Sequence, residues 1–217
     1  MITVCMPVGP QSYYKRYVQE AIDSVKAQTL PAAELLIIDD MAGLPDSPDY
    51  RIWRAPWRLG LPAVANLGIA LSKTELVFQM SCDDKLHPDC LKYCWREWLR
   101  RKDPLGYYWV DTEYSTGEKQ SLPHGNAMVT KTLWRRTGGF APELSIGACD
   151  SAFISILLAH PGKAGNLYRV ESPYPLYWHR EYPEQYTKQQ IVGPSTILEV
   201  RGIITKRWAP PQWGRYE

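Results

Sequence analysis

Residues 74–88 read T-E-L-V-F-Q-M-S-C-D-D-K-L-H-P and contain the pattern that decides the fold. The apolar run Leu76-Val77-Phe78 is bounded by polar residues and is too short for a free-standing helix, so it predicts a buried strand. Two adjacent carboxylates, Asp83 and Asp84, follow it. A fold that keeps both of them ionised usually supplies a cation, because like charges repel, and oxygen ligands suit Mg²⁺ or Mn²⁺. For these two residues alone, an exposed acidic turn that caps a helix is the alternative.

Around this stretch, apolar strand patterns alternate with amphipathic helix patterns. The alternation predicts an α/β fold in which helices flank a mostly parallel central sheet. Strands are expected at residues 2–8, 34–40, 51–54, 74–80, 105–111 and 125–130, with a hairpin at 113–120 and one more strand beyond Gly165. Helices are expected at residues 14–28, 59–72, 87–101, 131–136 and 149–159. In the second helix, we expect Leu67, Ala70 and Leu71 to face the core.

Composition narrows the class of protein. The 217 residues are 45% hydrophobic and 22% charged, which is ordinary for a soluble globular protein with one sizeable core. No run of 18 apolar residues predicts a membrane span, and the N-terminus does not read as a signal peptide, so we expect a cytoplasmic protein. The five cysteines include no C-x-x-C pair, which favours reduced thiols over zinc binding. A net charge of +2 is too small to predict a nucleic-acid partner by itself.

Carboxylates recur where the predicted elements begin or end. Asp39 and Asp40 close the second strand, Asp83 and Asp84 close the fourth, and Asp150 lies at a helix start. In open α/β sheets, ligands bind beyond the carboxyl ends of the strands. Stability does not require carboxylates to be collected there, whereas a nucleoside diphosphate with its metal ion does.

In order and spacing, the chain resembles an inverting glycosyltransferase of the family-2 type with a GT-A fold. The matching segments are I-T-V-C-M-P, A-I-D-S-V-K-A-Q-T, E-L-L-I-I-D-D, the long run from G-L-P-A-V-A-N to C-D-D-K-L-H-P-D, then G-G-F and A-C-D. They span about residues 2–160. The resemblance implies a Rossmann-like nucleotide-binding half and an acceptor-binding half within residues 1–165. Residues 166–217 would form a C-terminal extension or lid packed on the same domain.

The resemblance also implies roles for individual residues. Asp39 or Asp40 would recognise the nucleotide base. The rest of the donor nucleotide site would comprise Pro7, Val8, Gly9, Asn66 and Asp83. Asp84, with Asp83 and His179, would hold Mn²⁺ or Mg²⁺, and His179 could also contact the diphosphate. Asp150 would be the general base, and its other possible role is that of a helix cap.

The expected donor is a nucleotide-sugar, with a UDP-sugar first, and the expected acceptor is a glycan or another hydroxyl compound. His124 and Trp178 are candidates for contact with the acceptor. The basic residues of the helix at 87–101 leave a nucleic-acid acceptor as a weaker alternative. The aromatic and basic tail, which includes Arg201, Trp208 and Trp213, would suit a lid over a diphosphate and equally a contact with nucleic acid or a membrane surface.

Five residues depart from the family's pattern. Ser81 stands where the acidic motif usually begins with Asp, Cys149 replaces the acid before the catalytic Asp, Ala65 replaces an Arg, and Val8-Gly9 replaces Tyr-Asn. These departures leave open a nucleotide-sugar-binding protein that has lost its catalytic activity. A nucleotidyltransferase is a further alternative, although the segment after the first strand is not a convincing Gly-rich phosphate loop.

Overall fold

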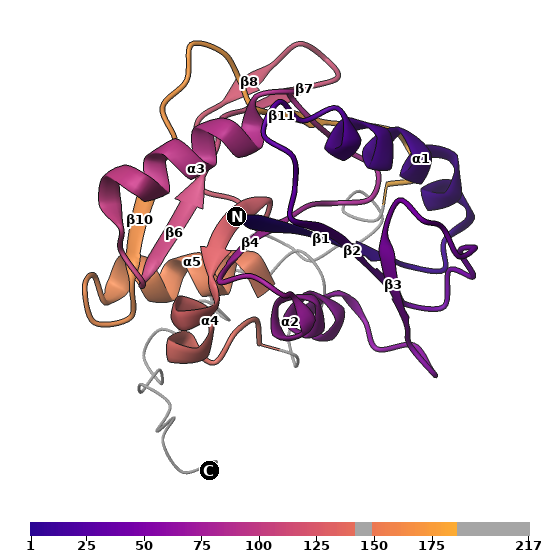
Figure 1. Cartoon of the computed structure of the whole chain (residues 1–217), viewed down its shortest axis with the longest axis horizontal. Helices are drawn as coiled ribbons and strands as arrows, with labels where there is room; N and C mark the ends of the chain where they lie inside the picture. Colours follow the sequence, from indigo (N-terminus) through magenta and orange to yellow (C-terminus); the bar gives the residue numbers. More distant parts are fainter. Residues whose placement is uncertain (142–148, 186–217) are drawn as a thin grey trace.

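The protein is described by a computed structural model that covers residues 1–141 and 149–185. Its main sheet has seven strands in the order β10-β6-β9-β4-β1-β2-β3 (Figure 1). Their bounds are β1 Ile2–Val8, β2 Glu34–Asp39, β3 Arg51–Arg54, β4 Leu76–Gln79, β6 Gly106–Trp109, β9 Ala127–Thr130 and β10 Asn166–Arg169. Only β9 runs antiparallel to its neighbours, so the predicted mostly parallel α/β sheet is confirmed.

Helices cover both faces of this sheet, and each face has its own apolar core. On one face pack α1 (Ser12–Lys26) and α3 (Cys90–Arg101), and on the other pack α2 (Leu61–Leu71), α4 (Lys131–Thr137) and α5 (Cys149–Ala159) (Figure 1). Neighbouring residues of β1 point to opposite faces, so Val4 and Met6 join the first core while Cys5 joins the second. The central strands are therefore buried on both sides, which explains their continuous apolar runs.

Helix α2 lies unusually close to the sheet because it carries a glycine at the contact. A methyl group on Gly68 would lie 1.9 Å from the Cys5 Sγ atom. The buried face of α2 consists of Val64, Ala65, Gly68 and Ile69. The prediction that Leu67, Ala70 and Leu71 face the core is confirmed for the two leucines, which are partly buried and pack against the core on this face of the sheet, and is wrong for Ala70, which is exposed. The helix is apolar almost all round, so sequence periodicity did not fix its rotation.

A second sheet of four short strands lies beside the main one. Its order is β5-β11-β7-β8, with bounds Lys85–Leu86, Tyr177–His179, Thr112–Tyr114 and Lys119–Gln120. The predicted hairpin is confirmed as the antiparallel pair β7–β8. Strands β5 and β11 were not predicted, because they have only two and three residues and depend on pairing with distant partners. The second sheet brings residues near 180 to the end of β4.

The other predicted elements are confirmed, and their ends either agree with the prediction or differ from it by one to three residues. The predicted domain boundary at residue 165 falls just before β10, which pairs with β6 in the main sheet. The division at 165 stays a prediction, and residues 186–217 of the predicted lid lie outside the described part of the chain. In the ranges 1–141 and 149–185, no helix is both long and apolar enough to cross a membrane.

Candidate active site

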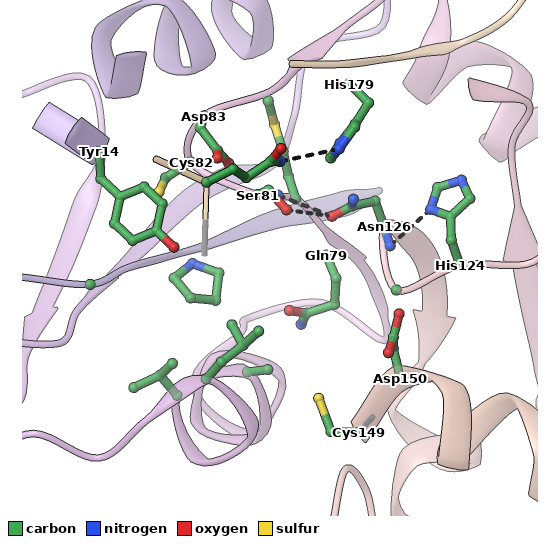
Figure 2. Close-up of a pocket in the computed structure, with 18 of the residues that line it drawn as sticks. Tyr14, Gln79, Ser81, Cys82, Asp83, His124, Asn126, Cys149, Asp150 and His179 are labelled. Carbon is green, nitrogen blue, oxygen red and sulfur yellow. Dashed lines mark hydrogen bonds between the residues drawn. The ribbon is translucent and has the colours of Figure 1, made fainter. Parts of the chain in front are cut away.

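A pocket of about 330 Å³ opens at the carboxyl ends of β1 and β4. Segments far apart in sequence meet there, as Figure 2 shows: Ser81, Cys82 and Asp83 follow β4, while Cys149 and Asp150 begin α5. Seven of the predicted site residues line this pocket, namely Pro7, Gly9, Asp40, Asp83, His124, Asp150 and His179. The predicted residues that do not line it are Val8, Asp39, Asn66, Asp84 and Trp178.

The two adjacent carboxylates have different environments. Asp83 lines the pocket, and its Oδ2 atom accepts a hydrogen bond from Tyr182 at 2.7 Å. Burial, and then the neighbouring Asp84 carboxylate, raise the pKa of Asp83 to about 6. Asp84 is completely buried and accepts three hydrogen bonds, from Tyr177 Oη at 2.7 Å, His179 Nδ1 at 3.1 Å and Arg180 N at 2.8 Å. Asp83 therefore faces the ligand space, while Asp84 anchors the second sheet.

His179 is oriented by Asp84. With Nδ1–H donating to Asp84, the other ring nitrogen, Nε2, lies 3.2 Å from the Gln185 amide nitrogen at the pocket (Figure 2). Burial alone would lower the pKa of His179, but the hydrogen bond to Asp84 raises it overall. A carboxylate that holds one imidazole nitrogen while the other faces outward is the usual arrangement behind a metal-binding histidine.

The segment of residues 180–185 holds this side of the pocket against α1. Arg180 pairs with Glu20 at 2.7 Å and stacks over Tyr17, and its Nε atom donates to the Asp83 backbone oxygen at 2.9 Å. Tyr182 packs against the rings of Tyr13 and Tyr17. Both pocket-facing groups of the predicted metal site, Asp83 and His179, thus contact side chains of this segment.

The pocket also extends to the end of β1, where Pro7 and Gly9 lie beside Tyr14 and Asp40. Asp40 accepts backbone hydrogen bonds from Leu59 at 2.7 Å and Gly60 at 3.0 Å, which fixes the start of α2. Asp39 instead accepts from the backbone of residues 42–44 and is 2% exposed. Of the two predicted base-recognition residues, only Asp40 lies at the pocket.

Asp150 lies at the first turn of α5 with its carboxylate beside Gly125. A methyl group on Gly125 would lie 3.0 Å from Asp150 Cβ and 3.1 Å from its Oδ2 atom, so the glycine makes this position available. Asp150 Oδ1 accepts a hydrogen bond from the Ser151 backbone N–H at 2.7 Å, a contact at the N-terminal end of the helix. The neighbouring Cys149 is buried, and burial raises the pKa of its thiol to about 12, so it carries no charge at neutral pH.

His124 is held by bonds within the protein. Its Nδ1 accepts from the Asn126 backbone N–H at 3.2 Å, and its Nε2 lies 3.0 Å from the Val110 carbonyl and 2.9 Å from the Thr112 hydroxyl. Burial lowers the pKa of His124, which keeps the ring neutral. Asn126 Oδ1 in turn accepts from the backbone and hydroxyl of Ser81, at 3.1 and 3.0 Å (Figure 2). A neutral Ser–Asn pair thus occupies the position where the family pattern predicted a carboxylate.

Asn66 and Trp178 lie away from the pocket. The Asn66 amide bonds both backbone groups of Phe140, at 2.7 and 2.8 Å, and accepts from the Trp134 indole at 2.8 Å. It therefore joins α2 to the G-G-F turn. Trp178 stacks under Lys85 and Arg180. Their predicted roles in ligand binding have no geometric support here.

A divalent cation fits Asp83 and His179. The pKa of Asp83 is raised because its negative charge is unfavourable where it lies, and a bound cation would stabilise that charge. His179 already has the carboxylate partner, Asp84, that typically orients a metal-binding histidine. Mg²⁺ typically takes one or two protein carboxylates and completes its shell with substrate phosphates and water. No group of three or more acidic, histidine or cysteine ligands occurs in the part of the chain that the structure describes.

Several pocket residues were missed from the sequence, among them Gln11, Tyr14, Gln79, Asn126, Tyr177 and Gln185. Gln79 had a visible signal, since it is a polar residue inside an otherwise apolar strand. Tyr14 and Tyr177 had no such signal, because Tyr14 reaches the pocket through the packing of α1 and Tyr177 through the second sheet.

The fold and the pocket define an α/β protein that binds its ligand at the carboxyl ends of parallel strands, with acidic side chains from three segments. The sequence profile of Glycosyl transferase family 2 matches residues 3–153, and the chain belongs to this family of glycosyltransferases.

Two curated relatives from Pasteurella multocida match at 23% identity, a chondroitin synthase from strain Pm70 and a hyaluronan synthase. Each match covers 71% of this chain, and the chain spans only 18% of each relative's length. Among solved structures, S. aureus TarS residues 1–349 in complex with UDP-GlcNAc superposes with a TM-score of 0.76 at 13% sequence identity. That match covers 95% of this chain and 67% of the other, and it confirms the GT-A fold.

Proposed function

We propose that the chain transfers a sugar from a nucleotide-sugar donor, first of all a UDP-sugar, to an acceptor hydroxyl with inversion at the anomeric carbon. The observation that carries the proposal is the shared pocket: Asp83 and His179 face it from one side, and Asp150 faces it from another. The reaction needs this separation, because the leaving diphosphate and the attacking hydroxyl lie on opposite faces of the sugar.

The nucleoside part of the donor would bind at the end of β1. There the Pro7 and Gly9 backbone lies beside the Tyr14 ring and the Asp40 carboxylate. A ring and a backbone edge suit a flat base, and carboxylate and carbonyl oxygens accept from base or ribose donors.

The diphosphate would bind next to Asp83 and His179, and these two residues would hold Mn²⁺ or Mg²⁺. When bound, the cation neutralises the negative charge that grows on the leaving diphosphate. Asp84 orients His179 through the 3.1 Å hydrogen bond and is a positioning residue in this proposal. Tyr182 and Gln185 now contact Asp83 and His179, so the donor would bind with a rearrangement of these contacts.

Asp150 would be the general base. As the acceptor oxygen forms its bond to the anomeric carbon, the bond from that carbon to the diphosphate breaks, and the hydroxyl proton passes to an Asp150 carboxylate oxygen. Such proton transfer typically contributes about 10²–10⁴-fold to the rate. Gly125 leaves the space in which this carboxylate lies.

The comparisons support the donor class. The solved structures of S. aureus TarS that share this fold are complexes with UDP-GlcNAc and with UDP. The relatives named chondroitin and hyaluronan synthase suggest a glycan as the acceptor here. The five cysteines are free and buried, which fits the reducing cytoplasm that we propose as its location.

A second candidate is a nucleotide-sugar-binding protein without turnover. The neutral Ser81–Asn126 pair and the uncharged Cys149 favour it, since both stand where the family pattern has acids. Family membership favours either candidate over nucleotidyl transfer.

The experiment begins with thermal unfolding in the presence of UDP-, GDP- and dTDP-sugars and their parent diphosphates, with and without Mn²⁺. A ligand that binds only the native state raises the melting temperature by mass action. For the donor that binds, transfer to glycan acceptors and to water is then measured in wild type, Asp150→Asn and the exposed control Asp46→Asn. Transfer by wild type and control that is lost in Asp150→Asn supports the enzyme. Binding without transfer favours the second candidate, and no binding refutes both.

A further inference from the structure

Gln79 is a polar side chain at the last position of β4, a strand whose four residues are all buried. It is 6% exposed, and it lines the pocket. Its Nε2 atom is buried and has no hydrogen-bond partner among the residues that the structure describes. A buried amide N–H without a partner costs about 1–3 kcal/mol, so a folded protein keeps one only where something offsets the cost.

The surroundings within the protein do not satisfy this amide. Gln79 pairs in register with Cys5 of β1, whose thiol is its nearby neighbour on the α2 face of the sheet. Burial raises the pKa of the Cys5 thiol to about 12, and the Gln79 amide partly offsets that increase. A thiol is a weak acceptor, so this contact leaves the amide without a strong partner.

Gln28 shows what a structural glutamine looks like in this chain. It is also 6% exposed, but its Nε2 donates to the Ser24 and His87 carbonyls at 3.1 and 2.8 Å, and its Oε1 accepts from Leu91 N at 2.9 Å. The two glutamines are equally buried, and only Gln79 turns its amide into a pocket.

We propose that Gln79 is a specificity-determining residue whose Nε2 group donates a hydrogen bond to an oxygen of the transferred sugar. The inference rests on the proposed function and names a contact within that site. Figure 2 shows the Gln79 side chain pointing into the pocket between Ser81 and Cys149, with Asp150 beside it and Tyr14 on the other side. Its place lies between the proposed diphosphate site at Asp83 and the proposed base, Asp150, where the sugar must be during transfer.

The chemistry of the group fits a sugar. A neutral N–H donor pairs well with a hydroxyl or carbonyl oxygen. A site whose buried polar group bonds to one substrate oxygen rejects an analogue that lacks this oxygen, because the group is then left without a partner. Gln79 would therefore distinguish sugars by the presence and orientation of one oxygen substituent.

The first test measures dissociation constants by calorimetry with Mn²⁺ for wild type, Gln79→Met, Gln79→Glu and the control Gln28→Met. The probes are the UDP-, GDP- and dTDP-sugars of the panel, each with its parent diphosphate. Met keeps the length of the side chain without the donor, and Glu offers only acceptors. We expect both Gln79 variants to weaken the preferred sugar nucleotide by roughly 5- to 100-fold, with less than a two-fold change for the parent diphosphate. Gln28→Met should leave the ratio of the two constants unchanged.

The second test measures the melting temperature of each variant without ligand. If Gln79 had a structural role, its replacement by Met would lower the melting temperature. Gln79→Met removes an unpartnered donor and should leave the melting temperature unchanged or higher. Gln28→Met breaks three hydrogen bonds and should lower it.

The outcomes separate the two proposals. If wild type binds none of the nucleotides, the proposed function and the role of Gln79 both fall. If the diphosphate binds and Gln79→Met weakens it as much as the sugar nucleotide, or weakens neither, only the role of Gln79 falls. A melting temperature lowered in Gln79→Met as much as in Gln28→Met also overturns that role.

Discussion

Replacing each of the two adjacent aspartates by asparagine should have opposite effects on stability. Asp84→Asn should strongly destabilise the ligand-free protein, whereas Asp83→Asn should leave it unchanged or more stable. The chemical change is the same and the positions are neighbours, so the difference depends only on what each carboxylate contacts. Asp84 accepts three hydrogen bonds in a completely buried position, and Asp83 accepts one side-chain hydrogen bond, from Tyr182.

The magnitude follows from those contacts. A hydrogen bond to a charged group contributes about 1.5–3 kcal/mol. An asparagine at position 84 keeps one acceptor oxygen but replaces the other with an NH₂ group. This NH₂ group would face donors that now bond to the second carboxylate oxygen, and it cannot accept their hydrogen bonds. Loss of one or two of the three bonds, with a buried donor left unpaired, costs about 3–5 kcal/mol, as for other broken buried pairs. For a chain of this size, that lowers the melting temperature by about 6–20 °C.

Asp83 differs because burial and the Asp84 charge raise its pKa to about 6. Its carboxylate is still mostly ionised at neutral pH, but that charge costs more free energy in the native state than in the unfolded chain, and a neutral asparagine removes this penalty.

The assay is urea and thermal denaturation at pH 7.5 without nucleotide and with chelator. Asp46→Asn serves as an exposed control. A loss of stability in Asp83→Asn equal to that in Asp84→Asn would refute the division of roles between the two residues. So would an Asp84→Asn variant as stable as wild type.

Three further predictions concern other positions. Asp150→Asn should reduce sugar transfer at least 100-fold with nucleotide affinity and melting temperature retained, and retained transfer would remove it as the base. Gly125→Ala should lower the maximal rate more than it changes donor affinity, because the new methyl group lies about 3 Å from the Asp150 side chain; unchanged kinetics would refute this steric argument. Burial alone would raise the pKa of Glu34, but hydrogen bonds from Arg51 and Lys73 N lower it overall. Glu34→Gln should therefore cost about 1–2 kcal/mol at pH 7. Because the folded pKa lies below the unfolded one, this difference should shrink as pH falls below about 4.5; a constant difference in urea denaturation from pH 7 to pH 3.5 would contradict it.

The main sheet could be predicted because its strands are contiguous apolar runs between clear breaks. The bounds of β3 and α5 came out as predicted, and the mostly parallel arrangement followed from the alternation of strands and helices. The rotation of α2 could not be predicted, because a helix with apolar residues on nearly all sides gives no preferred face. Strands β5 and β11 could not be predicted either, since K-L and Y-W-H have no strand pattern of their own.

At the pocket, the sequence predicted which segments contribute carboxylates but could not assign the direction of each side chain. Asp40, Asp83 and Asp150 do meet at one pocket. Asp39 and Asp84 are the sequence neighbours of Asp40 and Asp83, but their carboxylates point away from the pocket. Asp39 accepts hydrogen bonds from backbone N–H groups, and Asp84 accepts one from the Tyr177 hydroxyl. Successive residues at a strand end point in different directions, and which one points inward depends on the tertiary donors nearby. Asn66 was predicted to lie in the donor nucleotide site on the basis of the family motif alone. Its amide instead makes hydrogen bonds to both backbone groups of Phe140.

The partners of Asp84 and Asp83 lie 93 and 99 residues further along the chain, at Tyr177 and Tyr182. During synthesis, both carboxylates therefore leave the ribosome long before the tyrosine hydroxyls that donate hydrogen bonds to them in the folded protein. Contacts between residues so distant in sequence form late, because the intervening chain must first be ordered. The main sheet can assemble from β1, β2 and β4 without them, so the pocket would be the last part of the protein to mature. A nascent chain that stalls before residue 177 would have a folded nucleus and two repelling carboxylates, but no binding site.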